Sequence, residues 1–135
     1  MGSRKRNSAN ANKEFRKDLV SASLNNCPTS PRKMRLIADQ IRGKKIDKAL
    51  SILKFSPKHA SNRLEKLLLS AINNWQQKNP ESDIENENIV VSEIRVDSAG
   101  MLKRLRPAPQ GRAHRIRKRS NHVTMVLDSL KEINK

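Results

Sequence analysis

Lys and Arg dominate residues 99–119 (AGMLKRLRPAPQGRAHRIRKR), which contain eight of them and no Asp or Glu. Such side chains bind and neutralise phosphate oxygens, so the chemistry predicted here is polyanion binding. We expect His114 to hydrogen-bond to phosphate or sugar, and Gly111 to let the backbone approach the nucleic acid closely. The cationic candidates are Lys103, Arg104, Arg106, Arg112, Arg115, Arg117, Lys118 and Arg119.

A second basic cluster accompanies a predicted helix that starts after Ser30-Pro31. Cations in a first helical turn oppose the helix dipole, and a phosphate contact would offset that cost. We therefore favour a second nucleic-acid contact over a merely solvated face. Its candidate residues are Arg32, Lys33, Arg35, Arg42, Lys44 and Lys45.

The sequence gives no comparable support for a catalytic site or a metal site. The three His residues do not occur at metal-ligand spacing with Cys or carboxylate partners, and Cys27 is the sole cysteine. His114, His122 and Lys118 could in principle serve a ribonuclease, which we keep as a minor alternative. We read the acidic segment 78–88 as a solvent-facing linker, with Glu81, Asp83, Glu85 and Glu87 turned away from the polyanion. No catalytic residue, metal or cofactor is predicted.

Composition points the same way. The 135 residues have a formal net charge of +16 and a pI near 10.8, far beyond what solubility requires. Aromatic residues are only 2%, which favours recognition of phosphate and shape over base stacking. No apolar run approaches a membrane span, no signal peptide is evident, and a single free thiol suits a reducing compartment. We expect a cytosolic protein.

The elements that position the basic residues can be read from the flanks of the first stretch. Residues 89–97 and 121–127 are β-branched and apolar with partial alternation, which predicts two strands. Pro and Gly near the centre predict that these strands form one long hairpin, with an extension at about 97–119 that projects on the order of 30 Å. Its tip is Arg106, Pro107, Ala108, Pro109 and Gln110.

The remaining chain predicts a small α+β domain. We expect a third strand within residues 15–24, broken at 25–28 and paired with the base of the hairpin. Three helices follow: one from 31 to a stop at Gly43, a short one from Asp47 to about Leu53, and one from Ser56-Pro57 to about Gln77. Trp75 belongs to the core stripe of the last helix. The predicted fold is three helices packed on a three-stranded antiparallel sheet, with one long basic β-hairpin.

The predicted organisation is a single domain over residues 14–128 between two tails. Residues 1–13 are polar and carry Arg4-Lys5-Arg6, so we predict a flexible basic tail that orders on nucleic acid. Residues 129–135 form a short C-terminal tail.

Two motifs carry a resemblance to a known family. Gly111-Arg112 followed after nine residues by His122-Val123-Thr124-Met125-Val126-Leu127 resembles the C-terminal signature of ribosomal protein L twenty-two, a large-subunit protein. Residues 30–44 (SPRKMRLIADQIRGK) resemble that family's first-helix motif. The likeness extends over about residues 21–127 and includes the element order and hairpin length. At the tip, Ala108-Pro109 replaces an Arg-Ala pair of many bacterial members.

The resemblance implies a function without catalysis. Its expected partners are large-subunit rRNA, neighbouring ribosomal proteins and the nascent polypeptide, with no membrane partner and no homo-oligomer. The hairpin would thread rRNA and line the exit tunnel with its tip, and the protein would support subunit assembly. From the residues alone, a DNA-binding architectural protein remains the main alternative, since it also needs charge and an arm.

Overall fold

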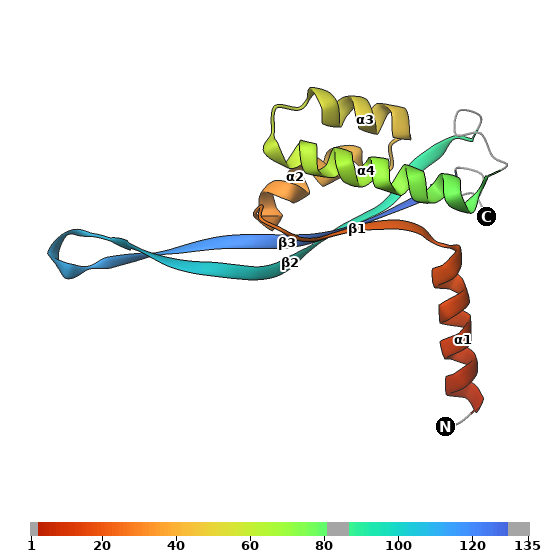
Figure 1. Cartoon of the computed structure of the whole chain (residues 1–135), viewed down its shortest axis with the longest axis horizontal. Helices are drawn as coiled ribbons and strands as arrows, with labels where there is room; N and C mark the ends of the chain where they lie inside the picture. The colour runs from red at the N-terminus through yellow and green to blue at the C-terminus, as the bar shows by residue number, and fades with distance from the viewer. Residues whose placement is uncertain (1–2, 81–86, 130–135) are drawn as a thin grey trace.

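The computed structural model describes residues 3–80 and 87–129. The chain forms α1 (Ser3–Asp18), β1 (Val20–Cys27), α2 (Pro31–Ile41), α3 (Ile46–Phe55), α4 (His59–Lys78), β2 (Ile89–Pro107) and β3 (Ala113–Ser129), with one 3₁₀ turn, η1 (Pro109–Gly111), at the hairpin tip. The strands make an antiparallel sheet in the order β1-β3-β2. The predicted α+β class is confirmed, with α1 as an additional helix (Figure 1).

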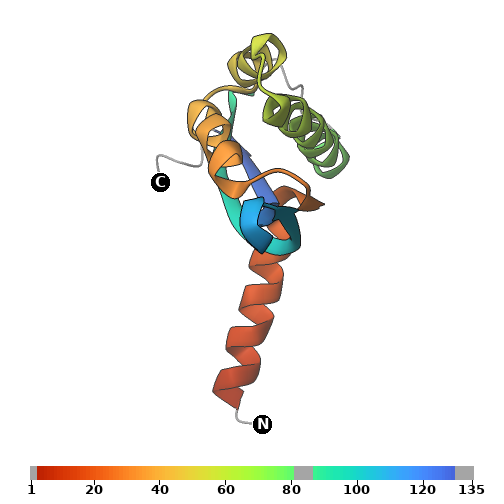
Figure 2. The ribbon, with the colours of Figure 1, turned by 90° about the vertical axis from the view of Figure 1, so that its left-hand side faces the viewer.

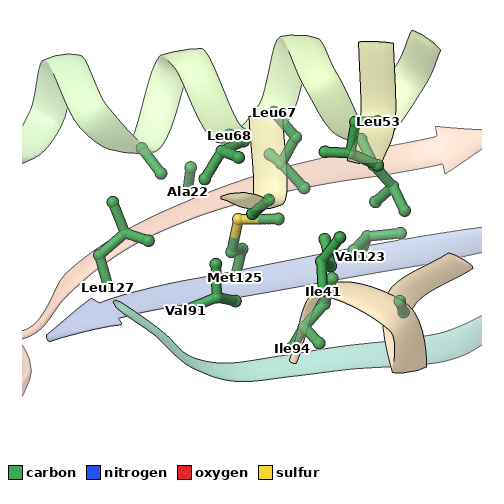
Figure 3. Close-up of a cluster of buried hydrophobic side chains, with 14 of the residues drawn as sticks. Ala22, Ile41, Leu53, Leu67, Leu68, Val91, Ile94, Val123, Met125 and Leu127 are labelled. Atoms are coloured by element: carbon green, nitrogen blue, oxygen red, sulfur yellow. The ribbon is translucent and has the colours of Figure 1, made fainter. Parts of the chain in front are cut away.

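Three helices cover one face of the sheet. The alternation of β3 turns Val123, Met125 and Leu127 toward them, because successive strand residues point to opposite faces. Helix α4 supplies an apolar stripe that includes Leu64, Leu68 and the predicted core residue Trp75. The helices lie on the same side of the sheet in Figure 2, and the shared core is drawn in Figure 3. This core ends where the long hairpin leaves the sheet.

Several predicted boundaries are wrong. The third strand begins at Val20 rather than near residue 15 because α1 extends through Asp18. That strand also continues to Cys27, since Asn26 adopts a left-handed backbone (φ 52°) in a bulge. Helix α3 begins at Ile46, one residue before the predicted start, so Asp47 lies in its first turn. Ser56 ends α3, and α4 starts only at His59 after Lys58.

Helix α2 stops before Gly43 as predicted, but its start has no side-chain cap hydrogen bond. Ser30 occupies the N-cap position and Pro31 the first helical position of α2, yet the Ser30 side chain makes no cap hydrogen bond. Gly43 follows the helix with a φ of 71°, a conformation that glycine adopts without strain. The amide of Gly43 then donates to the Val91 carbonyl at 2.8 Å, which ties the end of α2 to strand β2.

The N-terminal segment differs from its prediction. We expected a flexible tail over residues 1–13, but its described part belongs to the 16-residue helix α1. Between Ser3 and Asp18 the sequence lacks Gly and Pro and contains Ala, Lys, Arg and Glu, which all favour a helix. Low apolar content concealed this helix, because it has no stripe that would face a core. Of the acidic linker, residues 81–86 lie outside the described part of the chain, and so do residues 130–135 of the C-terminal tail.

Candidate nucleic-acid interface

The basic arm is a two-stranded ribbon that stays paired to its end. We define the arm as residues 99–119; its ladder runs from Met101 opposite Arg119 to Pro107 opposite Ala113. In Figure 1 this ribbon projects far beyond the helices, as a narrow twisted extension of the sheet. The predicted hairpin is therefore confirmed, and its pairing carries the cations well away from the core.

A bulge marks the point where the arm leaves the sheet. Ala99 and Gly100 of β2 lie opposite Ser120 alone, because the register shifts between Ser98 and Met101. Such bulges bend a strand and increase its twist. Beside it, the buried Asn121 side chain donates from Nδ2 to the Thr29 carbonyl at 2.6 Å. The root of the arm is therefore fixed to the segment between β1 and α2.

Both faces of the arm are cationic. Residues directly opposite one another in an antiparallel ladder share a face. One face collects four cations, Lys103, Arg115, Arg117 and Arg119, and the other face collects Arg104, Arg106 and Lys118 together with His114. All of them are exposed. A partner that uses both faces must surround the ribbon.

Apolar side chains are interleaved with these cations. Leu105 is 69% exposed, and Leu102 and Ile116 are also open to solvent. A hollow of about 440 Å³ lies in the middle of the ribbon, lined by Lys103, Arg104, Leu105, Arg115, Ile116 and Arg117. Its cations can hold phosphates, while Leu105 and Ile116 can contact the apolar faces of sugars or bases. This mixed lining suits nucleic acid better than a small charged ligand.

Residues 108–112 form the five-residue connection between the paired strands, so Arg106 and Pro107 of the predicted tip still belong to β2. The amide of Ala108 donates to the Arg112 carbonyl at 2.9 Å, and the Arg112 amide donates to Pro109 at 3.4 Å. Gln110 and Gly111 both take left-handed conformations, with φ of 63° and 70°. The predicted role of Gly111 thus acquires a conformational reason, since L-residues adopt this region at a cost.

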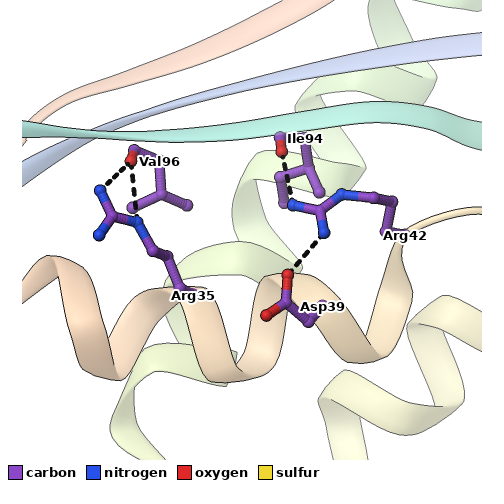
Figure 4. A network of polar contacts seen from close by, with 5 residues as sticks. All are labelled: Arg35, Asp39, Arg42, Ile94 and Val96. Atoms are coloured by element: carbon purple, nitrogen blue, oxygen red, sulfur yellow. Dashed lines mark hydrogen bonds and ion pairs between the residues drawn. The ribbon is translucent and has the colours of Figure 1, made fainter.

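Two of the predicted phosphate ligands are engaged within the protein. Arg35 donates from Nη2 and Nε to the Val96 carbonyl at 2.9 and 3.3 Å. Arg42 donates to the Ile94 carbonyl at 3.0 Å and to Asp39 at 2.6 Å (Figure 4). These contacts cover polar groups of β2, an edge strand of the sheet. Sequence reasoning missed this use because neither pairing has a local sequence signal.

The other cations of this cluster border the same edge. Arg32 and Lys33 are exposed in the first turn of α2. Along β2, Arg35 contacts Val96, which is nearer the arm than Ile94, the residue that Arg42 contacts. The first turn of α2 therefore lies toward the arm. Lys44 and Lys45 lie beyond the other end of α2, where Lys45 donates to Asn88 Oδ1 at 2.6 Å. The structure thus places the first-turn cations toward the arm, and Lys44 and Lys45 away from it.

The positions of His114, Lys118 and His122 do not support the minor ribonuclease alternative. Strand β3 contains His114, Lys118 and His122 at intervals of four residues. About 13 Å of strand therefore separates each of them from the next. His122 Nδ1 also accepts a hydrogen bond from the Asn26 amide at 3.1 Å. Three groups so far apart cannot act on one phosphate. Within residues 3–80 and 87–129, no group of three or more His, Cys, Asp or Glu residues could hold a metal ion.

Comparison with known proteins identifies the family. The model of the family described as Ribosomal protein L22p/L17e matches residues 22–128, from within β1 to the end of β3. The chain belongs to this family. The resemblance inferred from the hairpin signature and the first-helix motif is thereby confirmed. Of the eight described elements, only α1 precedes the matched L22p/L17e region.

Curated relatives in the L22p/L17e family cover almost the whole chain. "Large ribosomal subunit protein uL22" of Flavobacterium johnsoniae is 67% identical over 96% of this chain and 95% of the relative. The protein of the same name from Christiangramia forsetii is 68% identical over 94% of both chains. That of Porphyromonas gingivalis is 60% identical over 99% of both chains, so it includes a segment that corresponds to α1.

Proposed function

We propose that the protein is a structural component of the large ribosomal subunit that binds rRNA with its arm and with the exposed cations of α2. Membership of the L22p/L17e family makes it a ribosomal protein, located in the bacterial cytoplasm, and not an enzyme. The observation that carries the rRNA-binding role is the arm itself. Eight cations and no acid lie on a ribbon that is paired up to Pro107 and Ala113.

The shape of the arm favours insertion into folded RNA. A free two-stranded ribbon is marginal in water, and like charges along it repel one another. Phosphates on both sides would remove that repulsion, because cations occupy both faces. A single groove on duplex DNA would meet only one face, so the DNA-binding alternative leaves half of the charge unused. The tip of the arm would then reach deepest into the RNA. This agrees with the proposed lining of the exit tunnel by residues 106–110 and with contact to the nascent polypeptide.

Among the described residues, no helix is long and apolar enough to cross a bilayer. Neighbouring ribosomal proteins remain proposed partners, and we propose no homo-oligomer and no cofactor.

The first test is sedimentation of lysate through a sucrose gradient at moderate and then high salt, with the protein followed by mass spectrometry. Co-migration with the large subunit that survives high salt is expected for an arm threaded through RNA. Release into the soluble fraction, or migration with nucleoid DNA, would contradict the proposal and favour the DNA-binding alternative.

The second test removes charge from the arm alone. The double variant Arg112→Ala/Arg115→Ala should weaken binding to large-subunit rRNA and reduce the slope of log K against log salt by about 2. Its free energy of unfolding should not change, because both side chains are exposed. The matched control is Lys54→Ala/Lys66→Ala, which removes the same charge from exposed positions of α3 and α4. Equal rRNA affinity of the two variants would refute the role of the arm.

A further inference from the structure

Helix α1 stands away from the rest of the fold. Every residue from Ser3 to Lys17 is exposed, and Figure 1 shows the helix projecting from the end of the sheet opposite the arm. A 16-residue helix rich in Asn and Ser is marginal in water when nothing packs along it. A partner outside the chain would stabilise this helix.

Five of the six Lys and Arg residues of α1 lie on one side of the helix. At 3.6 residues per turn, its basic face occupies about 120° of the circumference. This basic face consists of Lys5, Arg6, Lys13, Arg16 and Lys17, with Ala9 at its centre. The opposite side carries Ala11, Glu14 and Phe15, together with one cation, Arg4. Such a face has no apolar centre of the kind that protein interfaces use, so it suits a polyanion.

Helix α4 makes polar contacts with the C-terminal end of α1 and the start of β1. Lys78 Nζ donates to the carbonyls of Lys17 and Leu19 at 2.6 and 2.5 Å, and Asn74 donates to the Ser21 carbonyl at 3.0 Å. The positive charge of Lys78 also favours the C-terminal end of the α1 dipole. These contacts attach the base of α1 and the start of β1 to α4.

The two basic elements reach different places. Val20, just after α1, pairs with Leu127, whereas the arm begins beyond Asn121. Six residues of β3, or about 20 Å, separate these two points. The arm and α1 also leave the sheet at opposite ends in Figure 1. One short RNA segment cannot satisfy both.

We propose that α1 is a second rRNA-binding element, whose basic face docks on the phosphate backbone of an RNA segment distinct from the one that holds the arm. This proposal deepens the proposed function and rests on it. In the relative from Porphyromonas gingivalis a corresponding segment is present, although the family model begins only at residue 22. The helix would thus add a contact that the matched family region does not contain.

The test is hydroxyl-radical footprinting of large-subunit rRNA bound to the full-length protein. The basic-face variant is Arg6→Gln/Lys13→Gln/Lys17→Gln. Its control, Asn7→Glu/Ser8→Glu/Ala11→Glu, lowers the net charge equally on the opposite side. An arm variant, Arg115→Gln/Arg117→Gln, marks the protections that belong to the arm. Circular dichroism should show that the helical content of the first two variants matches.

We expect two separate sets of protected nucleotides. The basic-face variant should lose one set and keep the set that depends on the arm, with the salt slope reduced by about 3, while its control keeps both. Retention of both sets by the basic-face variant, or equal loss in the control, would overturn the proposal for α1 alone. Absence of the arm-dependent set would overturn the proposed function as well.

A photo-crosslinking amino acid identifies the partner directly. Placed at Ala9, at the centre of the basic face, it should crosslink to rRNA in purified large subunits. Placed at Ala11, on the opposite side, it should give a several-fold lower yield. A crosslink from Ala9 to a ribosomal protein, with no RNA adduct, would overturn the proposal in favour of a protein contact.

Discussion

Arg35 shows how one side chain can be misassigned from sequence. It lies on the exposed basic side of α2, yet its guanidinium donates two hydrogen bonds to the Val96 carbonyl. A planar fork of donors can hold a carbonyl of an edge strand that would otherwise stay open to solvent. Arg35 therefore helps to attach α2 to β2 just before the arm begins, whatever it contributes to phosphate binding.

Substitution at Arg35 should separate structure from binding. Arg35→Met should lower the free energy of unfolding by about 1 kcal/mol, since hydrogen bonds from charged donors count for more than neutral ones but this one is solvent-exposed. Urea denaturation would measure it. Arg32→Met, which removes an exposed cation from the first turn of the same helix, should not lower stability. If both variants unfold at the same urea concentration, the contact of Arg35 with Val96 has no structural weight.

At the scale of an element, the tip of the arm depends on two consecutive left-handed residues. Gly111→Ala places a side chain at a φ of 70°, although a Cβ there would meet nothing within 4 Å. The cost is therefore conformational, about 1 kcal/mol, and confined to the tip. Hydrogen exchange of the Ala108 amide, which donates to Arg112, should accelerate about fivefold.

The same exchange measurement contains its own controls. Amides of the buried strand residues Val123 and Met125 should keep their protection in Gly111→Ala. Gln110→Gly should slow exchange at Ala108 or leave it unchanged, because glycine adopts the left-handed conformation of that position freely. Accelerated exchange in the core of Gly111→Ala would mean that tip and core unfold together.

The elements that sequence reasoning found share a strong local signal. Alternation and a Pro-Gly centre mark the long hairpin, and apolar residues at helical spacing mark α2. Both elements are present in the structure. What it missed depends on tertiary contacts or weak propensity. Helix α1 lacks an apolar stripe, the start of α4 shifts to His59, and the bulge at Asn26 is completed by His122 from a distant strand. Within the candidate site, composition predicted the arm cations, whereas the engagement of Arg35 and Arg42 required β2 to be placed.

At the scale of the whole molecule, the protein exposes far more surface than a compact chain. Its accessible surface is 10339 Å², whereas a compact monomer of 15.4 kDa would expose about 7,200 Å². The arm and α1, whose described residues are nearly all exposed, contribute to this excess. These two elements contribute little to the core, which agrees with the proposal that they bind rRNA.

Removal of the arm tests whether folding depends on the core while rRNA binding depends on the arm. Ser98 and Asn121 are direct partners in the ladder, so a two-residue Asn-Gly turn can join them in place of residues 99–120. The shortened protein should fold with a free energy of unfolding within about 1 kcal/mol of the parent, because the deleted residues lie outside the core. Thermal unfolding and the dispersion of amide NMR signals would measure this.

Binding should respond in the opposite way to folding. The deletion removes eight cations, so the slope of log K against log salt for large-subunit rRNA should fall by about 6 to 7, and the protein should no longer sediment with the subunit at high salt. Retained binding would place the main rRNA contact on α2 and α1 instead. Loss of folding would show that the arm stabilises the sheet from which it grows. We expect an intact core that is no longer stably incorporated into the large subunit. This combination follows only if the core serves mainly to hold and orient the arm.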